Sequence, residues 1–259
     1  MQNRHRGSVL SFYSWGWNLL AFVVVVITGF VVGTINGMAG GASLISFPVL
    51  LALGLNPVSA TVTNALGVTS ANLFAVRASD HSAKALIRQY KFHIALSATF
   101  ACLGAILLLA LPSKVFEGVV PYLLLGATLT ILLPAKARSG MKHKLTEFIA
   151  IAASGFYCGY FGPGQGVMVI ATLARDKKRD PNTVNAVKNV IVGVTSIISN
   201  TIYIFSGRVH WLLVVALFIG SSSGGTLGGK WANKMPPSFY KSLVFAVGII
   251  ASVWLFVRN

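Results

Sequence analysis

The sequence predicts an all-α polytopic membrane protein built from two inverted repeats of about five segments each. Of its 259 residues, 55% are hydrophobic and only 10% are charged, whereas soluble domains carry about 25% charged residues. Apolar runs of about 20 residues, the length of helix that spans a bilayer, recur along the chain. Motifs also recur at a nearly constant spacing, which indicates a duplication.

Ten apolar segments divide the chain. Two of them, 41–54 and 163–174, are short: at about 1.5 Å per residue each is roughly 20 Å long, less than the ~30 Å hydrocarbon core. Each follows a glycine cluster, so both are predicted to be half-helices. The ten segments are 15–38, 41–54, 57–77, 89–111, 115–134, 144–160, 163–174, 182–205, 209–230 and 238–257.

The internal repeat has an offset that stays between 122 and 126 residues. GTINGMAGG begins at Gly33 and GFYCGYFGPGQG begins at Gly155. Several matches follow in the same order: Val62-Thr63-Asn64 with Val187-Lys188-Asn189, Val68-Thr69-Ser70 with Val194-Thr195-Ser196, and Leu111-Pro112 with Met235-Pro236. The chain therefore divides into a first transmembrane repeat at 15–134, a cytoplasmic linker at 135–143 and a second transmembrane repeat at 144–257.

An odd number of segments in each repeat would invert the second copy, and the charges fit this arrangement. Loops 77–91, 135–146, 174–181 and 230–241 hold 15 of the 21 Lys and Arg residues, and the opposite side holds five. Basic loops stay in the cytoplasm. The N-terminal tail is then expected outside. The net charge of +16 follows from these loops, so no nucleic-acid partner is expected.

The glycine clusters interrupt the helices inside the membrane. They are NGMAGGAS, 36–43, and GYFGPGQG, 159–166. Non-helical backbone at that depth is tolerated only where protein or a water-filled cavity surrounds it. In transporters with inverted repeats, the half-helix N-termini at such breaks point toward anionic substrates. The two breaks are therefore expected to face each other around an anion.

Close helix packing is an alternative role for some glycines. Gly33 and Gly37 have the spacing of a GxxxG contact, and so do Gly155 and Gly159. For these four the two interpretations remain open. The glycines at 40, 41, 162, 164 and 166 are too dense for packing alone, so a break is expected there.

Several polar residues near the breaks are candidate ligands. Lys188 is the one Lys or Arg well inside a span, where a charge is costly and usually functional; snorkelling to the interface is the alternative. Asn64 and Asn189 are repeat equivalents that would contact substrate or join helices. The predicted substrate-binding set is Asn36, Gly40, Gly41, Ser43, Asn64, Gly162, Gly164, Gln165, Gly166, Lys188 and Asn189.

Acidic residues are absent from the predicted spans. Asp80, Glu117, Glu147, Asp176 and Asp180 fall in loops or at segment ends. This argues against a cation substrate and against proton coupling through a carboxylate. An anion that leaves a cell with a negative interior gains about 2.3 kcal/mol per charge per 100 mV, so the potential alone could drive export.

Other residue types point to no catalytic or metal chemistry. Cys102 and Cys158 fit neither a disulfide framework nor a metal site, and no HExxH or GxSxG motif occurs. No cofactor and no catalytic residue is expected. His93 and His210 are interpreted as interfacial side chains, Arg77 as a headgroup anchor, and the five tryptophans as an aromatic belt.

Two motifs resemble those of the TauE/SafE sulfite exporter family. NGMAGGASLISFPVLLALGLNP, followed by ATVTNA, is similar to the first motif, and GYFGPGQG followed by NAVKN is similar to the second. The resemblance extends from about residue 20 to 257. Gly-Gly-Ala at 40–42 and Val62-Thr63-Asn64 depart from the common pattern. The resemblance implies a bacterial inner-membrane permease for sulfite, sulfonates or related small anions, with Lys188 as the lysine of the second motif.

Two other functions remain open. An anion channel would share the site but would need no alternating gate. A non-transporting membrane assembly subunit would bind nothing at the breaks. The expected partners are a small anionic substrate and the lipid bilayer, and a homodimer is also open.

Overall fold

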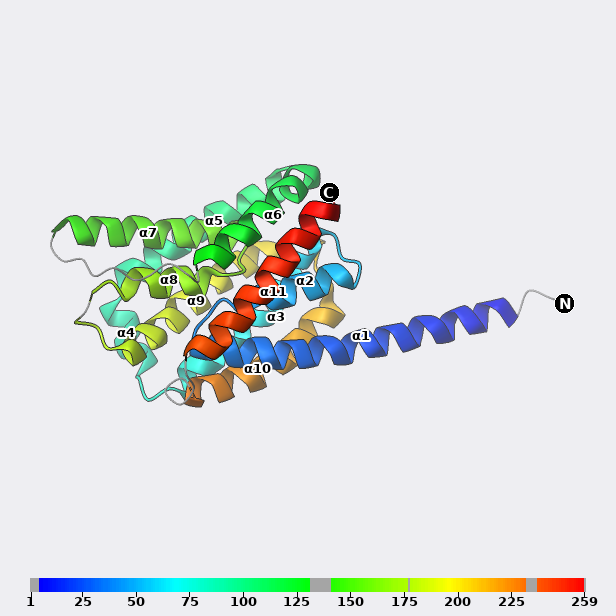
Figure 1. Ribbon diagram of the computed structural model, residues 1–259, viewed down its shortest axis with the longest axis horizontal. Coiled ribbons are helices and arrows are strands. Elements are labelled where there is room, and N and C mark those ends of the chain that lie inside the picture. Colours follow the sequence, from blue (N-terminus) through cyan, green and yellow to red (C-terminus); the bar gives the residue numbers. More distant parts are fainter. Residues whose placement is uncertain (1–4, 131–140, 177, 232–236, 259) are drawn as a thin grey trace.

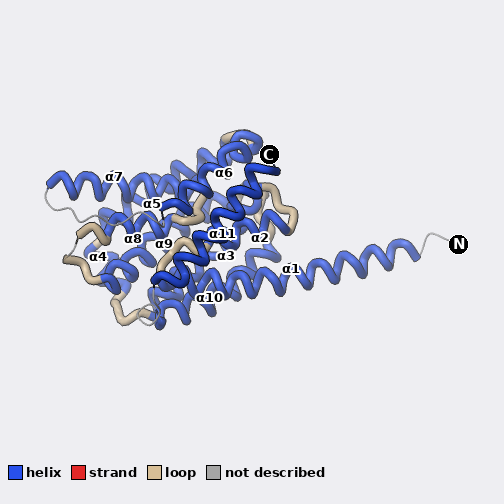
Figure 2. The backbone as a smooth tube through the Cα atoms, viewed as in Figure 1, coloured by secondary structure: helices blue, strands red, loops and turns tan. Residues whose placement is uncertain are grey.

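The computed structural model describes residues 5–130, 141–176, 178–231 and 237–258, and within them every regular element is a helix (Figures 1 and 2). This confirms the predicted all-α fold. The helices are α1 His5–Met38, α2 Ser43–Ala52, α3 Pro57–Ala78, α4 Ala83–Gln89, α5 Lys91–Ala110, α6 Ser113–Thr130, α7 Met141–Tyr160, α8 Gln165–Leu173, α9 Pro181–Ile204, α10 Trp211–Trp231 and α11 Pro237–Arg258.

Several predictions fall outside the described residues: Arg4, residues 135–140 of the linker predicted at 135–143, and Met235-Pro236. The last three residues of that linker, 141–143, belong to α7, and Arg6 lies in α1, where its side chain is not described. Trp15 and Trp17 lie in α1, but their side chains are not described. Trp211, Trp231 and Trp254 are all exposed. The aromatic belt therefore stays a prediction.

Within the part of the chain that the structure describes, four helices are long and apolar enough to cross a membrane: Leu19–Met38, Lys91–Ala110, Pro181–Ile204 and Trp211–Trp231. The protein is therefore an integral membrane protein. α2 has 10 residues and α8 has 9, so at about 1.5 Å per residue neither spans a bilayer. Both are half-helices, as the glycine clusters predict.

The predicted loop at 77–91 contains a seven-residue helix, α4, which the sequence patterns did not predict. The side chain of Ser82 accepts a hydrogen bond of 3.4 Å from the backbone N–H of Ala85, which caps the helix. Leu86 is buried. A single apolar anchor in a polar segment gives too weak a periodic signal to predict the helix.

The helix pairs follow the predicted correspondence of the two halves. α1 packs on α10, and α7 packs on α5. α3 packs on both α10 and α9, and α9 packs on both α5 and α3. α2 contacts α11, and α8 contacts α6. Each of these pairs maps onto another when α1, α2, α3, α5 and α6 are matched with α7 to α11. Their orientation across a membrane remains a prediction.

The four GxxxG glycines pack against backbone. Gly33 lies against Ser221 of α10, and Gly155 lies in the matching place against Ser97 of α5. Gly37 lies against Gly225 in the same way, and Gly159 lies against Ala101. A Cβ atom at any of these glycines would collide with or crowd the facing helix. The structure therefore favours the packing interpretation for all four.

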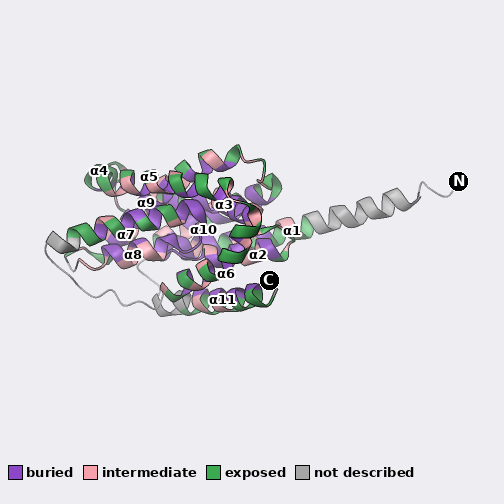
Figure 3. Ribbon diagram, turned by 90° about the horizontal axis from the view of Figure 1, so that it is seen from above, coloured by how far each residue is buried: buried purple, intermediate pink, exposed green. Residues whose placement is uncertain are grey.

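Figure 3 shows the buried residues gathered on the inward faces of the helices.

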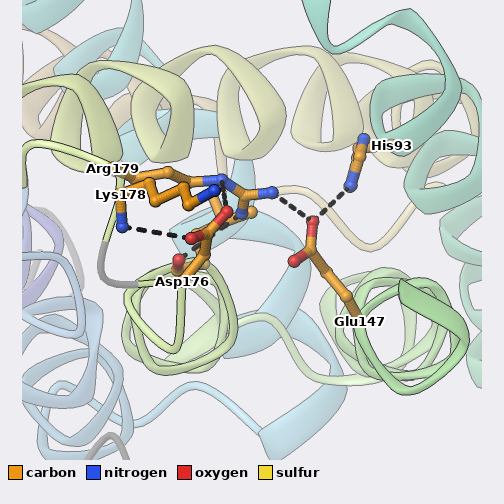
Figure 4. Close-up of polar contacts among 6 residues, drawn as sticks. His93, Glu147, Asp176, Lys178 and Arg179 are labelled. Carbon is orange, nitrogen blue, oxygen red and sulfur yellow. Dashed lines mark hydrogen bonds and ion pairs between the residues drawn. The ribbon is translucent and has the colours of Figure 1, made fainter. Parts of the chain in front are cut away.

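A partly buried ionic cluster, centred on the buried Glu147, joins α5, α7 and the loop between α8 and α9 (Figure 4). Oε1 of Glu147 lies 2.7 Å from Nε2 of His93 and 2.9 Å from Nη2 of Arg179. The Arg179 guanidinium also lies 3.6 Å from Asp176 and donates to the carbonyl of Leu173, the last residue of α8. His93 is thus a partner of Glu147, which corrects its interpretation as a lone interfacial side chain.

We expect Gly155→Ala to destabilise the protein by about 1–3 kcal/mol, the usual cost of overpacking. The added methyl would force α5 and α7 apart. The measurement is the unfolding temperature of the purified protein in detergent. Gly118→Ala is the matched control, because a Cβ there meets nothing within 4 Å. Equal unfolding temperatures for the two variants would contradict the close-packing interpretation.

We expect Glu147→Ala to lower the free energy of unfolding by about 3 kcal/mol, because it leaves the partly buried Arg179 without its carboxylate. Glu147 is itself only 5% exposed. Detergent-solubilised protein unfolded by heat or denaturant gives the measurement, with Asp80→Ala, an exposed acid, as the control. A variant as stable as the control would show that the cluster adds nothing to stability.

Candidate functional site

The two glycine clusters interrupt the helices, and each interruption needs glycine. α1 ends at Met38 and α2 begins at Ser43, with Gly40 at φ 77° and Gly41 at φ 85°. α7 ends at Tyr160 and α8 begins at Gln165, with Gly162 at φ 92° and Gly164 at φ 97°. These are left-handed conformations that side chains with a Cβ disfavour. The two motifs are therefore rich in glycine because their turns require positive φ angles.

The two breaks touch each other across the halves. A Cβ on Gly40 would lie 2.9 Å from Cα of Gly166, and a Cβ on Gly166 would lie 3.0 Å from Cα of Gly40. A Cβ on Gly41 would reach 2.5 Å from the side chain of Val167. Only bare backbone at these positions lets the start of α8 lie against the turn before α2.

The two half-helices start without a side-chain cap, as α5 also does. α3, α4 and α9 each begin with a side-chain cap, from Asn56, Ser82 and Asp180 respectively. α2 begins after Ala42 and α8 begins after Gly164, and neither has a side-chain cap. The N–H groups of Gln165 and Val167 donate to the carbonyls of Gly162 and Gly164, at 3.2 Å and 3.1 Å, so what the start of α8 offers a ligand is mainly the positive end of the helix dipole.

A small cavity of about 40 Å³ lies at these N-termini. A single water needs about 10–15 Å³ on this measure, so the cavity is large enough for a small polyatomic ion or a few waters. Its walls come from both halves. They are Asn36, Ser43, Asn64, Ala65, Val68, Thr69, Asn72, Cys158, Phe161, Gly162, Gln165, Gly166, Val192, Ser196 and Ser199.

Gln165 is the most distinctive residue in the cavity wall. It is 1% exposed, and within the described chain neither its Nε2 nor its Oε1 has a hydrogen-bond partner. Oδ1 of Asn72 is likewise buried without a partner. Asn64 uses its Oδ1 to accept a 2.5 Å bond from Ser46. Buried amides without partners are costly, so they mark a place where a polar ligand would gain hydrogen bonds.

Lys188 is fully buried in α9, but its ammonium group points to the end of α1. Nζ donates to the carbonyl of Asn36 at 2.5 Å and to Oδ1 of Asn189 at 2.6 Å. The amides of Asn185 and Asn189 both donate to the carbonyl of Gly37, at 2.9 Å and 3.2 Å. The two asparagines of the NAVKN motif therefore satisfy the carbonyl of Gly37. Lys188 adds a second donor to the carbonyl of Asn36, which also accepts from the backbone N–H of Gly40 at 3.1 Å.

The predicted site residues thus fall into two groups. Asn36, Ser43, Asn64, Gly162, Gln165 and Gly166 line the cavity. Gly40, Gly41, Gly164, Lys188 and Asn189 do not line it; they shape the breaks or hold the end of α1. Lys188 is nonetheless close, because its Cδ lies 3.4 Å from the position of a Cβ on Gly166. Asn36 links the two groups, because it lines the cavity and its carbonyl accepts a hydrogen bond from Lys188.

The cavity wall also contains residues that the sequence did not predict: Asn72 and the hydroxyl-bearing Thr69, Ser196 and Ser199. A signal existed for Asn72. It lies eight residues after Asn64, which places both side chains on one face of α3. No group of His, Cys, Asp and Glu within the described residues could hold a metal ion.

Known proteins with similar sequences are membrane transporters, which agrees with the helical membrane fold. The model of the family described as sulfite exporter TauE/SafE matches residues 25–255. A probable membrane transporter protein of Haemophilus influenzae is 28% identical over 83% of this chain and 86% of its own length. Another from a Sinorhizobium species, ORF9, is 28% identical over 92% and 93%, and YfcA of Escherichia coli is 24% identical over 90% and 87%.

No solved structure matches the chain. The family match covers most of the residues that form the two breaks, the cavity and the NAVKN motif. The chain belongs to the sulfite exporter TauE/SafE family of membrane transporter proteins.

Proposed function

We propose that the protein is a permease, not an enzyme, that carries a small anion such as sulfite or a sulfonate across the bacterial inner membrane. The observation that carries the proposal is Gln165. It is a buried amide with both polar atoms unpartnered. It stands in a cavity at the uncapped start of α8. A bound oxyanion would accept from its amide and would lie at the positive end of the α8 dipole.

The sharing of the cavity between the halves supports alternating access. Asn36, Ser43 and Asn64 come from the first half, and Gln165 and Gly166 come from the second. Rocking one half against the other would open the cavity to either side of the membrane in turn. The contact between Gly40 and Gly166 lies where such a motion would separate the halves. A channel would need no such separation.

We expect Gln165→Ala to weaken anion transport about tenfold or more, since a hydrogen bond to a charged group contributes about 1.5–3 kcal/mol. The measurement is saturable sulfite flux into proteoliposomes that contain the purified protein. Gln89→Ala is the matched control, because Gln89 is exposed on α4 and does not line the cavity.

Three results would each change the conclusion. Equal flux through both variants would remove Gln165 from the site. Single-channel currents would identify a channel. The absence of flux for every small anion would favour a membrane assembly subunit.

We expect outward flux to depend on the membrane potential. A potential of 100 mV contributes about 2.3 kcal/mol per charge, or roughly fiftyfold in equilibrium accumulation. The test is sulfite efflux from vesicles under a fixed anion gradient, with the potential set by a potassium gradient and then collapsed. Unchanged efflux after the collapse would mean that the transport cycle moves no net charge.

A further inference from the structure

The short helix α4 lies at the level of the lipid headgroups. α5, from Lys91 to Ala110, is one of the helices that can span a membrane. Its 20 residues make about 30 Å of helix, which matches the thickness of the hydrocarbon core, so its first residue lies at an interface. α4 ends at Gln89, just before this residue. The side chains of α4 are therefore placed beside phospholipid headgroups on that side of the membrane.

The exposed face of α4 is basic and makes no ion pair. Lys84 and Arg88 are one helical turn apart, so they lie on one face, and Lys91 follows at the start of α5. All three are exposed, and no carboxylate of the described chain pairs with any of them. Segment 77–91 holds four Lys and Arg residues and one acid, Asp80. This face therefore carries an excess of positive charge.

An open hollow of about 620 Å³ lies along the basic face. This volume is in the range of small-molecule sites, about 300–1,000 Å³, so a glycerophosphate headgroup fits. Arginine can bind a phosphate through two parallel N–H···O bonds, and lysine adds a point charge. The hollow therefore offers the donors that a phosphodiester group accepts. Its walls are Ser82, Lys84, Ala85, Arg88 and Gln89.

Exposed apolar side chains flank the basic residues. Ile87 of α4 and Phe92 of α5 are both exposed. Nζ of Lys91 lies 5.1 Å from the centroid of the Phe92 ring, so a positive charge and an apolar surface are adjacent. A soluble phosphate gains little from such side chains, whereas the acyl chains of a phospholipid would cover them. The combination favours a lipid over a soluble anion.

We propose that α4 forms a binding site for an anionic phospholipid. The phosphate occupies the hollow beside Lys84 and Arg88, and the acyl chains lie against Ile87 and Phe92. None of the residues that line the hollow also lines the cavity at the helix breaks. The lipid is thus a second ligand, distinct from the transported anion, and its binding does not depend on the permease function.

The opposite face of α4 connects this site to α9. Leu86 is buried in an apolar cluster that also contains Val187 and Ile191 of α9. Nε2 of His81, just before α4, lies 3.3 Å from Oγ1 of Thr183 in the first turn of α9. A lipid that holds α4 in place would therefore also stabilise the start of α9. Because a ligand of the folded state stabilises it, bound lipid should raise the unfolding temperature.

Titration of the purified protein in detergent tests the proposal. Phosphatidylglycerol should raise the unfolding temperature. Phosphatidylcholine with the same acyl chains and soluble glycerol phosphate should not do so at the same concentration. Lys84→Gln/Arg88→Gln should require about tenfold or more phosphatidylglycerol for the same rise, because it removes both charges of the hollow.

Lys144→Gln/Lys178→Gln is the matched control. It removes the same charge from two exposed residues that do not line the hollow. They belong to the start of α7 and to the loop between α8 and α9, at the same end of the protein as α4 (Figure 1). The control should respond to phosphatidylglycerol as the wild type does. Without lipid, both double variants should unfold at the wild-type temperature, because all four side chains are exposed.

Three results would overturn the proposal. Equal stabilisation by glycerol phosphate would make the hollow a site for soluble anions. Equal stabilisation by phosphatidylcholine would show that the headgroup charge has no role. An equal loss of response in the two double variants would show diffuse attraction of lipid to the whole basic end. None of these results bears on anion flux, so the permease function is tested separately.

Discussion

The structure depends on how the backbone groups freed by two helix breaks are satisfied in a region without water. α1 stops inside the bundle, and the carbonyls of Asn36 and Gly37 at its end are bound by Asn185, Lys188 and Asn189 of α9. The N–H groups that begin α2 and α8 have no side-chain caps. The end of α1 is thus bound by side chains of α9, whereas the starts of α2 and α8 border the cavity without a side-chain cap.

This division explains the two sequence motifs. Glycine density is high because the turns need positive φ and because the two breaks touch through Gly40 and Gly166. The NAVKN motif has a basic residue between two amides because α1 ends against it. The repeat partner of Lys188 is Thr63, whose hydroxyl accepts from the backbone N–H of His210. The two halves therefore share a fold but fill equivalent places with different chemistry.

Most of the fold could be predicted from local patterns, and the site only in part. Apolar runs and glycine clusters lie along the chain itself, so both breaks and most helix bounds could be predicted. The exceptions are α1, which begins at His5 and not at residue 15, and the end of the segment predicted at 115–134, which lies outside the described residues. The cavity position of Gln165 followed from its place in a break. The direction of the Lys188 ammonium did not, because its partner lies about 150 residues away in sequence. The pair of His93 and Glu147 was missed for the same reason, since the two come from different helices.

Two residues of the ionic cluster, His93 and Glu147, occupy positions that the internal repeat matches with apolar residues. The glycine contacts pair Ser97 with Ser221, and the same register matches His93 with Leu217. The repeat offset matches Glu147 with Val25. Val25 and Leu217 are both fully buried in the apolar core. If the halves arose from one ancestral gene, one pair has replaced the other at a buried position. A carboxylate at such a position is costly without a partner, and in this chain both His93 and Arg179 supply one. The acid is therefore tolerated here because two basic groups lie within hydrogen-bond reach of it.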